Sequence, residues 1–309
     1  MSVVAGLLGG LLILILSGDA LVRGAVALAN RLGVPALVVS LTVVGFGTSA
    51  PELVVSFQAA LRGESGIAIG NIVGSNIVNV LLILGLPALF IGLDATRADA
   101  RASLVIMLGA ALLFGLLAWD GTVGRLDGAI LLASLGAMIL HTLRSDRQER
   151  PDGAAGENDA PLSSATTAGL LVAGLVGLPL GAHLFIGAAV DLAEALAIPD
   201  EVIGLTLVAA GTSLPELSAT AIAAWRRRPD VAIGNVIGSN IFNILGILGV
   251  TALAVPMPVP GRIMAGDFWI MVGTSLLLVP AVFAGMRFSR PTGAVLTGLY
   301  AGYAIWLLD

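Results

Sequence analysis

Two polar motifs occur twice in this chain at one offset of 164 residues, each time within an apolar stretch. Residues 47–53 read Gly-Thr-Ser-Ala-Pro-Glu-Leu, and residues 211–217 differ from them only by Leu in place of Ala. Residues 70–79 read Gly-Asn-Ile-Val-Gly-Ser-Asn-Ile-Val-Asn and recur at 234–243 with three apolar exchanges. A charged group at the centre of a bilayer costs about 2.5–3.5 kcal/mol on insertion scales. We therefore interpret the duplicated motifs as the functional site.

The composition places these motifs in a membrane. Of 309 residues, 57% are hydrophobic and 11% are charged, with a mean hydropathy of +1.01, whereas a soluble domain is about 25% charged. Apolar runs of about 18 residues recur along the chain, which predicts an all-α polytopic membrane protein. Unbroken runs such as 104–118 lack the alternation of barrel strands. The modest net charge of −5 suggests no nucleic-acid partner, and the absence of cysteine excludes disulfides.

The apolar pattern predicts ten transmembrane helices in two halves. A polar segment rich in Arg, Asp, Glu, Ser and Pro separates the halves. The expected domains are a first five-helix repeat at 1–142, a cytoplasmic linker at 143–163 and a second, inverted repeat at 164–309. The expected spans are 3–29, 36–61, 66–90, 103–119, 126–142, 165–196, 202–225, 231–254, 268–286 and 293–308.

The arginines predict the orientation of the chain. If both termini face outward, the outer loops hold only Arg62, Arg125 and Arg262, and Arg23 falls within the first span. Positive residues favour the cytoplasmic side, so this placement is the expected one. The inner loops then hold eleven arginines: Arg31, Arg97, Arg101, Arg144, Arg147, Arg150, Arg226, Arg227, Arg228, Arg287 and Arg290.

An odd number of spans per half means that the second half enters the membrane upside down. Inverted repeats are typical of secondary transporters, whose sites lie near the midplane on broken helices. Pro51 and Pro215 lack a backbone N–H, so each is expected to break its helix and free carbonyls near 45–48 and 209–212. Such backbone is tolerated at membrane depth only where it is buried in protein or lines a wet cavity.

The duplicated oxygens suit a hard cation such as Ca²⁺ or Na⁺. Carbonyls, hydroxyls and carboxylates are the ligands that these ions prefer. His141 and His183 do not recur at the repeat offset, which argues against zinc or copper. The plainer alternative is that Glu52 and Glu216 only hydrogen-bond to the facing motif, although one carboxylate would be enough to fasten two helices.

The second motif contains residues of different expected roles. Ser75 and Asn79 are four residues apart and share a helix face, as do Ser239 and Asn243, which suits lining a pathway. For the glycines we favour close helix packing, and for the other amides capping or interhelical hydrogen bonds. These residues are Gly70, Gly74, Gly234 and Gly238, and Asn71, Asn76, Asn235 and Asn240. For Asp19 and Arg23, four apart in the first span, we expect a local ion pair.

The paired motifs resemble the two α-repeats of the calcium/cation antiporter superfamily, above all its prokaryotic sodium/calcium exchanger branch, and the resemblance covers the whole chain. It implies Na⁺/Ca²⁺ antiport by alternating access, with spans 1 and 6 sliding across a fixed core. It also implies a prokaryotic inner-membrane location, with no cofactor, no enzyme activity and no obligatory protein partner. Its substrates would be Ca²⁺ and Na⁺.

Carried over by position, the resemblance assigns a role to each site residue. Glu52 and Glu216 would coordinate Ca²⁺ together with the carbonyls of Thr48 and Thr212, and Asn79 and Asn243 would line the centre. Asn243 is a departure, because some relatives carry Asp there, and in the potassium-dependent branch that Asp is tied to K⁺ transport. Asn at this position argues against K⁺ coupling. The flanking Na⁺ sites would be made by Ser49, Ser75, Ser213 and Ser239 with the carbonyls of Gly45 and Ala209.

Three other functions compete with this interpretation. Ca²⁺/H⁺ antiport uses the same architecture, but the proton-coupled branch usually carries a different Glu-containing motif. A passive cation channel would show downhill flux without countertransport. An intramembrane hydrolase would need a nucleophile–base arrangement, and the sequence offers no convincing one near Ser49 or Ser213.

Overall fold

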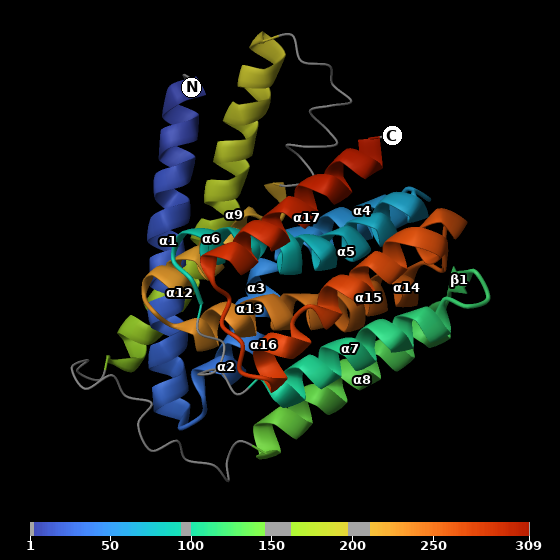
Figure 1. The fold of residues 1–309 in the computed structure, drawn as a ribbon, viewed down its shortest axis with the longest axis horizontal. Helices are drawn as coiled ribbons and strands as arrows, with labels where there is room; N and C mark the ends of the chain where they lie inside the picture. Colours follow the sequence, from blue (N-terminus) through green and yellow to red (C-terminus); the bar gives the residue numbers. More distant parts are fainter. Residues whose placement is uncertain (1–2, 94–99, 146–161, 197–210, 309) are drawn as a thin grey trace.

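The computed structural model describes residues 3–93, 100–145, 162–196 and 211–308, which are almost entirely helical (Figure 1). The helices of the first half are α1 (Val3–Leu32), α2 (Ala36–Val39), α3 (Gly45–Thr48), α4 (Ala50–Leu61), α5 (Ser65–Val78), α6 (Gly85–Phe90), α7 (Arg101–Leu117) and α8 (Arg125–Ser145). Those of the second half are α9 (Ser164–Ala195), α12 (Leu214–Trp225), α13 (Pro229–Ile241), α14 (Gly249–Ala254), α15 (Phe268–Leu276), α16 (Val279–Phe283) and α17 (Arg290–Leu308).

Helices α1 and α9 form a pair that crosses the other helices steeply (Figure 1). Glycines let the two backbones approach each other. A Cβ atom on Gly174 would lie 2.5 Å from Leu21 Cβ and 2.8 Å from its Cα, and one on Gly181 would lie 2.9 Å from Leu14 N. Small residues at helix interfaces permit such close packing inside a membrane, where no hydrophobic force drives helices together.

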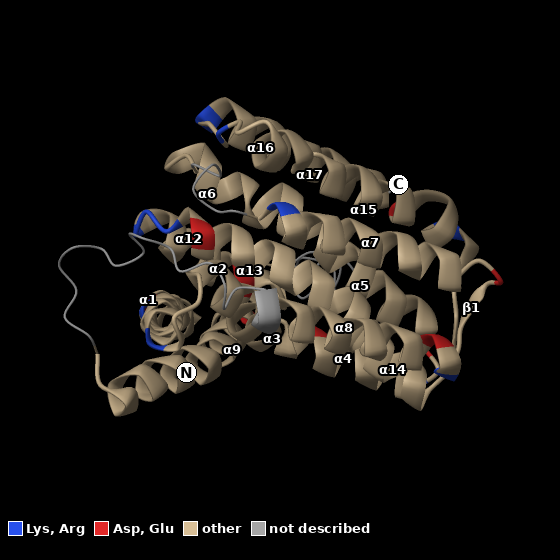
Figure 2. Ribbon diagram, turned by 90° about the horizontal axis from the view of Figure 1, so that it is seen from below, with Lys and Arg blue, Asp and Glu red and all other residues tan. Residues whose placement is uncertain are grey.

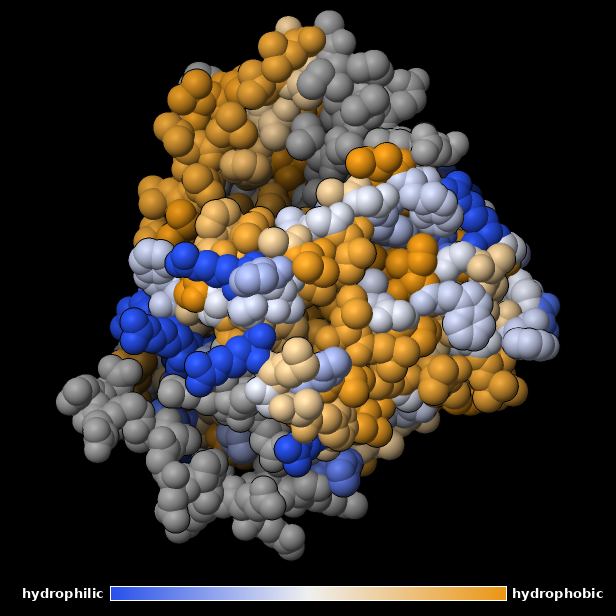
Figure 3. All heavy atoms as spheres, in the orientation of Figure 1, coloured by the Kyte–Doolittle hydropathy of each residue, from blue (hydrophilic) through white to orange (hydrophobic). Residues whose placement is uncertain are grey.

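The outward faces of this pair are apolar. Leu8 and Leu12 of α1 and Val172 and Val176 of α9 are each more than half exposed. Figure 3 shows hydrophobic side chains covering this part of the surface. Figure 2 shows that charged residues lie mainly at helix ends and in connecting loops. An apolar belt bounded by charged ends is the surface that lipid requires.

The chain bends at the first polar motif, as Pro51 predicts. Residues Ala36–Thr48 and Ala50–Leu61 meet at 46°, and Ser49, with φ −81° and ψ 8°, caps α4. Pro51 sits in the first turn of α4, where its missing N–H costs nothing. In the second copy, Ser213 is the N-cap residue of α12 and Pro215 lies in the first turn of that helix.

In the described part of the chain, four short π-helical segments interrupt the α-helices. They are Ser40–Val44, Asn79–Ile83, Phe242–Leu248 and Ile263–Asp267. One begins at Asn79 and another directly before Asn243, so both central asparagines lie where the helix widens. Such π-bulges occur frequently at functional sites, because the wider turn redirects side chains and carbonyls.

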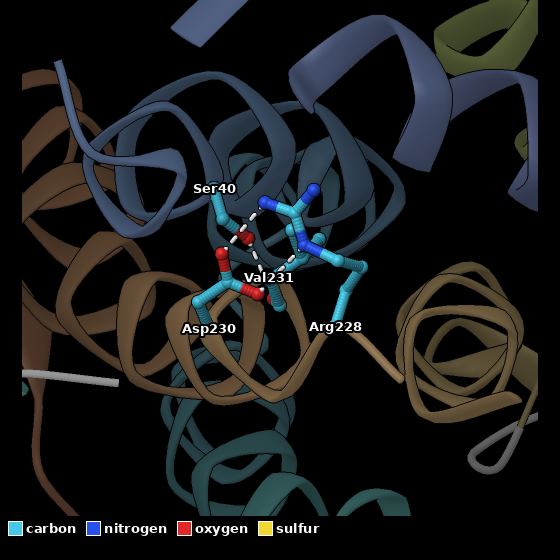
Figure 4. A network of polar contacts seen from close by, with 4 residues as sticks. All are labelled: Ser40, Arg228, Asp230 and Val231. Atoms are coloured by element: carbon cyan, nitrogen blue, oxygen red, sulfur yellow. Dashed lines mark hydrogen bonds and ion pairs between the residues drawn. The ribbon is translucent and has the colours of Figure 1, made fainter. Parts of the chain in front are cut away.

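The π-helical segment at Ser40 is anchored to the start of α13 (Figure 4). Ser40 Oγ donates a hydrogen bond of 2.7 Å to the Val231 carbonyl. Beside it, Arg228 Nε and Nη2 donate to the two carboxylate oxygens of Asp230 at 3.1 and 2.8 Å. Glycines tighten the same contact, since a Cβ atom on Gly238 would lie 2.5 Å from the Leu41 carbonyl. The bend is therefore held against α13.

The expected packing role of the motif glycines is confirmed in the second half. Cβ atoms on Gly234 and Gly238 would come within 3.0 Å of atoms of the Ser40–Val44 segment. Cβ atoms on Gly70 and Gly74 would have no neighbour within 4 Å in the described part of the chain. The repeat offset pairs the segment that packs on Gly234 and Gly238 with residues 204–208, which are outside the described ranges.

Two short backbone pairings link loops of the two halves at opposite ends of α7. Strands β1 (Thr122–Val123) and β2 (Met257–Pro258) pair antiparallel, with Val123 opposite Met257. At the other end, Leu93 and Phe288 exchange two backbone hydrogen bonds of 2.8 and 2.9 Å. Each pairing joins a loop of the first half to a loop of the second.

Six helices of the described residues are long and apolar enough to cross a membrane, or seven if the bent pair α2–α4 counts as one span. Helix α7, with 17 residues, is apolar but slightly shorter than these. Residues 202–210 of the expected seventh span, and 146–161 of the expected linker, lie outside the described ranges. The number of ten spans therefore remains a prediction.

Gly174→Ala should destabilise the α1–α9 pair, because the new methyl group would meet the Leu21 backbone. Overpacking of this kind lowers the free energy of unfolding by about 1–3 kcal/mol. The matched control is Gly169→Ala on the same helix, where a Cβ atom meets nothing within 4 Å among the described residues. That control should be neutral or more stable. Thermal unfolding in detergent measures both, and equal melting temperatures would contradict the close approach.

Candidate functional site

Glu52 and Glu216 occupy equivalent positions in the first turns of α4 and α12, and each is only 1% exposed. The carboxylates are bonded across the two halves. Ser49 Oγ donates to Glu216 Oε1 at 3.0 Å, and Ser213 Oγ donates to Glu52 Oε1 at 3.3 Å. Each motif thus supplies a carboxylate and the hydroxyl that binds the carboxylate of the other motif. The helix N-termini add partial positive charge, which favours the ionised carboxylates.

If the carboxylates served only to fasten helices, that role would explain the bonds of the two Oε1 atoms but not the state of the two Oε2 atoms. The second oxygens, Glu52 Oε2 and Glu216 Oε2, are buried without a hydrogen-bond partner in the described part of the chain. Asn79 Oδ1 and Asn243 Oδ1 are in the same condition. Buried polar atoms without partners are rare in proteins and call for an explanation. Carboxylate and amide oxygens suit Ca²⁺ or Na⁺, so the donor set fits these ions.

One flank of the site gathers three of the expected ligands. Thr48 Oγ1 lies 3.3 Å from Ser239 Oγ, and both hydroxyls lie 3.4 Å from the Gly45 carbonyl. Ser49, Ser75 and Ser213 are also buried. Thr212 is half-buried, and Ala209 lies outside the described residues.

The sites for Asn71 and Asn235 are alike in the two halves. Asn71 Nδ2 donates to the Glu52 carbonyl at 3.3 Å and to Ser56 Oγ at 2.9 Å. Asn235 Nδ2 donates to the Glu216 carbonyl and to Thr220 Oγ1 at the same two distances. The expectation of interhelical hydrogen bonds is confirmed for both amides. Each one fixes a Glu-bearing helix against its neighbour.

Ser56 and Thr220 were missed by the sequence analysis. Both are fully buried, one turn after Glu52 and Glu216. Ser56 accepts a hydrogen bond from the amide of Asn71, and Thr220 accepts one from the amide of Asn235. The signal was present, because Ser56 and Thr220 are separated by the same 164 residues as the motifs. The exchange of Ser for Thr breaks the identity of the repeats and hides this signal.

Asp19 has a second, closer partner than the one expected. The predicted pair with Arg23 exists at 3.8 Å, but Asp19 also bonds to Arg226, directly after α12. Spacing along one helix predicts only local partners, so a contact between α1 and the end of α12 could not be foreseen. Arg226 therefore ties α1 to the Glu216-bearing helix.

Asn235→Ala should weaken this framework, because it removes the two bonds of Nδ2 and a third, 3.2 Å long, from Thr48 Oγ1 to Asn235 Oδ1. We expect the free energy of unfolding to fall by about 1–3 kcal/mol. Gln58→Ala, which removes an exposed amide from α4, is the control and should change little. Thermal unfolding of both variants in detergent is the measurement. Indistinguishable curves would show that the hydrogen bonds of Asn235 do not stabilise the protein.

The profile of the family described as sodium/calcium exchanger protein matches this chain twice, at residues 2–144 and 166–308. Inner membrane protein YrbG of Escherichia coli is 36% identical over 97% of this chain and 94% of its own length. The sodium/calcium exchanger MaX1 of Methanosarcina acetivorans is 34% identical over 97% of each chain.

A solved structure shares the fold. The sodium-calcium exchanger NCX_Mj, soaked with zero Na⁺ and Ca²⁺, superposes with a TM-score of 0.86 at 33% identity over 99% of both chains. This similarity, with the two profile matches and full-length relatives, makes the chain an integral membrane protein. The chain belongs to the sodium/calcium exchanger protein family.

Proposed function

We propose that this protein exchanges Na⁺ for Ca²⁺ across a membrane by alternating access. The observation that carries this function is the buried pair Glu52 and Glu216. Each has one oxygen bonded across the halves and one oxygen without a partner among the described residues. Relatives named as exchangers of these ions give the same answer. The family is one of transporters, so the buried serines serve as ligands or hydrogen-bond donors and not as nucleophiles.

The buried charge explains why transport is coupled. Two carboxylates without a counterion are very costly in an apolar interior, because burial removes their hydration. One Ca²⁺ or several Na⁺ would neutralise the pair, and both would use the same oxygens of Glu52 and Glu216. The site can therefore change the side of the membrane to which it opens when it holds either ion, but not when it is empty. This produces exchange, since after Ca²⁺ dissociates on one side the site returns only when Na⁺, or another Ca²⁺, has bound.

We further propose the finer architecture expected from the sequence. It consists of ten spans in two inverted repeats, 1–142 and 164–309, joined by a cytoplasmic linker at 143–163. The two family matches and the reciprocal serine–glutamate bonds support this arrangement. Both termini would face outward from the inner membrane of a prokaryote. The ligand set would be the twelve residues carried over from the family, with Ca²⁺ and Na⁺ as substrates and no cofactor.

Ca²⁺ flux in proteoliposomes tests the function. Vesicles loaded with Na⁺ and diluted into Na⁺-free medium should accumulate labelled Ca²⁺, and uptake should fall to background without internal Na⁺. A pH gradient should not replace the Na⁺ gradient, and K⁺ should have no effect, because Asn243 supplies no third carboxylate. Uptake driven by the pH gradient alone would identify a Ca²⁺/H⁺ antiporter, and uptake without any counter-ion would identify a channel.

Glu52→Gln and Glu216→Gln should each nearly abolish Ca²⁺ exchange, because either change removes half of the charge that balances Ca²⁺. The amide keeps the shape of the side chain, so the variants should still fold and insert. Glu64→Gln, an exposed position directly before α5, is the control and should exchange normally. The assay is Na⁺-dependent uptake at matched protein amounts. Wild-type rates in either Gln variant at 52 or 216 would exclude the central assignment.

A further inference from the structure

The central asparagines are held differently in the two halves. Asn79 Nδ2 donates to Asn240 Oδ1 at 2.9 Å, and Asn240 Nδ2 donates to the Asn76 main-chain carbonyl at 3.4 Å. Asn240 therefore reaches across from α13 and fixes the amide plane of Asn79. With Nδ2 engaged, Asn79 Oδ1 remains free to face a cation, and this oxygen is buried without another partner among the described residues.

The equivalent bond in the other half is not formed. At the repeat offset, Asn243 corresponds to Asn79 and Asn76 to Asn240, so Asn243 Nδ2 should donate to Asn76 Oδ1. Instead, Asn76 Nδ2 donates to the Ile72 carbonyl of its own helix at 3.1 Å. Asn243 Nδ2, Asn243 Oδ1 and Asn76 Oδ1 are all buried without a partner in the described chain. A donor and its matching acceptor are thus both present and unused.

Leaving these atoms unpaired is costly. A buried donor or acceptor without a partner costs about 1–3 kcal/mol. A change in the Asn76 side chain would release the Ile72 carbonyl and offer its oxygen to Asn243, as Asn240 offers its oxygen to Asn79. The structure therefore holds one of two equivalent arrangements. Exchanging the roles of the two halves gives the other, and in an inverted repeat that exchange turns the site to the opposite side of the membrane.

We propose that Asn76 and Asn240 are positioning residues, each of which orients the ligand asparagine of the other half, and that one of the two bonds is formed at a time. In one orientation of the site Asn240 aims the Asn79 oxygen at the cation, and in the other Asn76 aims that of Asn243. This inference rests on the proposed transport function and on the inverted repeat. It assigns a sided role to two amides that need not touch the ion.

The test is the sidedness of Ca²⁺ affinity in Asn76→Ala and Asn240→Ala. Self-exchange of labelled for unlabelled Ca²⁺ is followed in right-side-out and inside-out membrane vesicles, with Ca²⁺ varied on the outer face of each. We expect Asn240→Ala to raise the half-saturating Ca²⁺ about tenfold on one side and less than twofold on the other, where tenfold corresponds to about 1.4 kcal/mol. Asn76→Ala should show the mirror effect.

A merely structural role would shift both sides alike or only lower the amount of folded protein, so equal shifts would overturn the proposal, as would no shift. If Asn240→Ala does not fold, Asn76→Ala decides alone, because here its side chain bonds only within its own helix among the described residues. Self-exchange of Ca²⁺ needs no Na⁺. Loss of Na⁺ coupling in the wild-type protein would therefore refute the proposed function, while the sided affinities would still judge this inference.

Discussion

The structure depends on keeping two carboxylates, Glu52 and Glu216, buried inside a membrane protein. Their cost is partly offset by a hydroxyl from the opposite motif, by the N-terminus of each helix and by neighbouring amides. The remaining cost is removed when a metal cation or a proton neutralises the pair. The desolvation cost of the two carboxylates makes this a poor structural core. The same cost suits a carrier, because the protein is most stable when the site is loaded.

The bonds around this pair run mostly between the halves of the chain. Ser49 donates a hydrogen bond to Glu216, and Ser213 donates one to Glu52. Asn240 accepts a hydrogen bond from Asn79. Each half supplies one carboxylate, so an ion bound by both carboxylates would lie at the surface where the two halves meet. A ligand at such a surface can respond to small movements of one half against the other, which a site built within a single half could not do.

The sequence predicts which residues form this site better than it predicts the hydrogen bonds and ion pairs between them. The duplication identifies the carboxylates, and Pro51 locates the bend, because both follow from local chemistry and the offset. The bond from Arg226 to Asp19 and the different states of Asn76 and Asn240 could not be predicted. Identical residues at equivalent positions carry the same sequence signal, whereas their contacts depend on how the two halves pack. Span number is also harder to predict, because short or bent helices enclosed by protein need not match the bilayer.

The paired loops have a consequence for ion selection. Val123 with Met257, and Leu93 with Phe288, fasten the halves together at both ends of α7. Two such pairings resist separation of the halves, and with it separation of α4 in the first half from α12 in the second. Helices α1 and α9 take part in neither pairing, and α1 is instead tied to the end of α12 through Asp19 and Arg226. The spacing of the carboxylates on α4 and α12, which limits the diameter of a cation that could fit between them, is thereby constrained from outside the site.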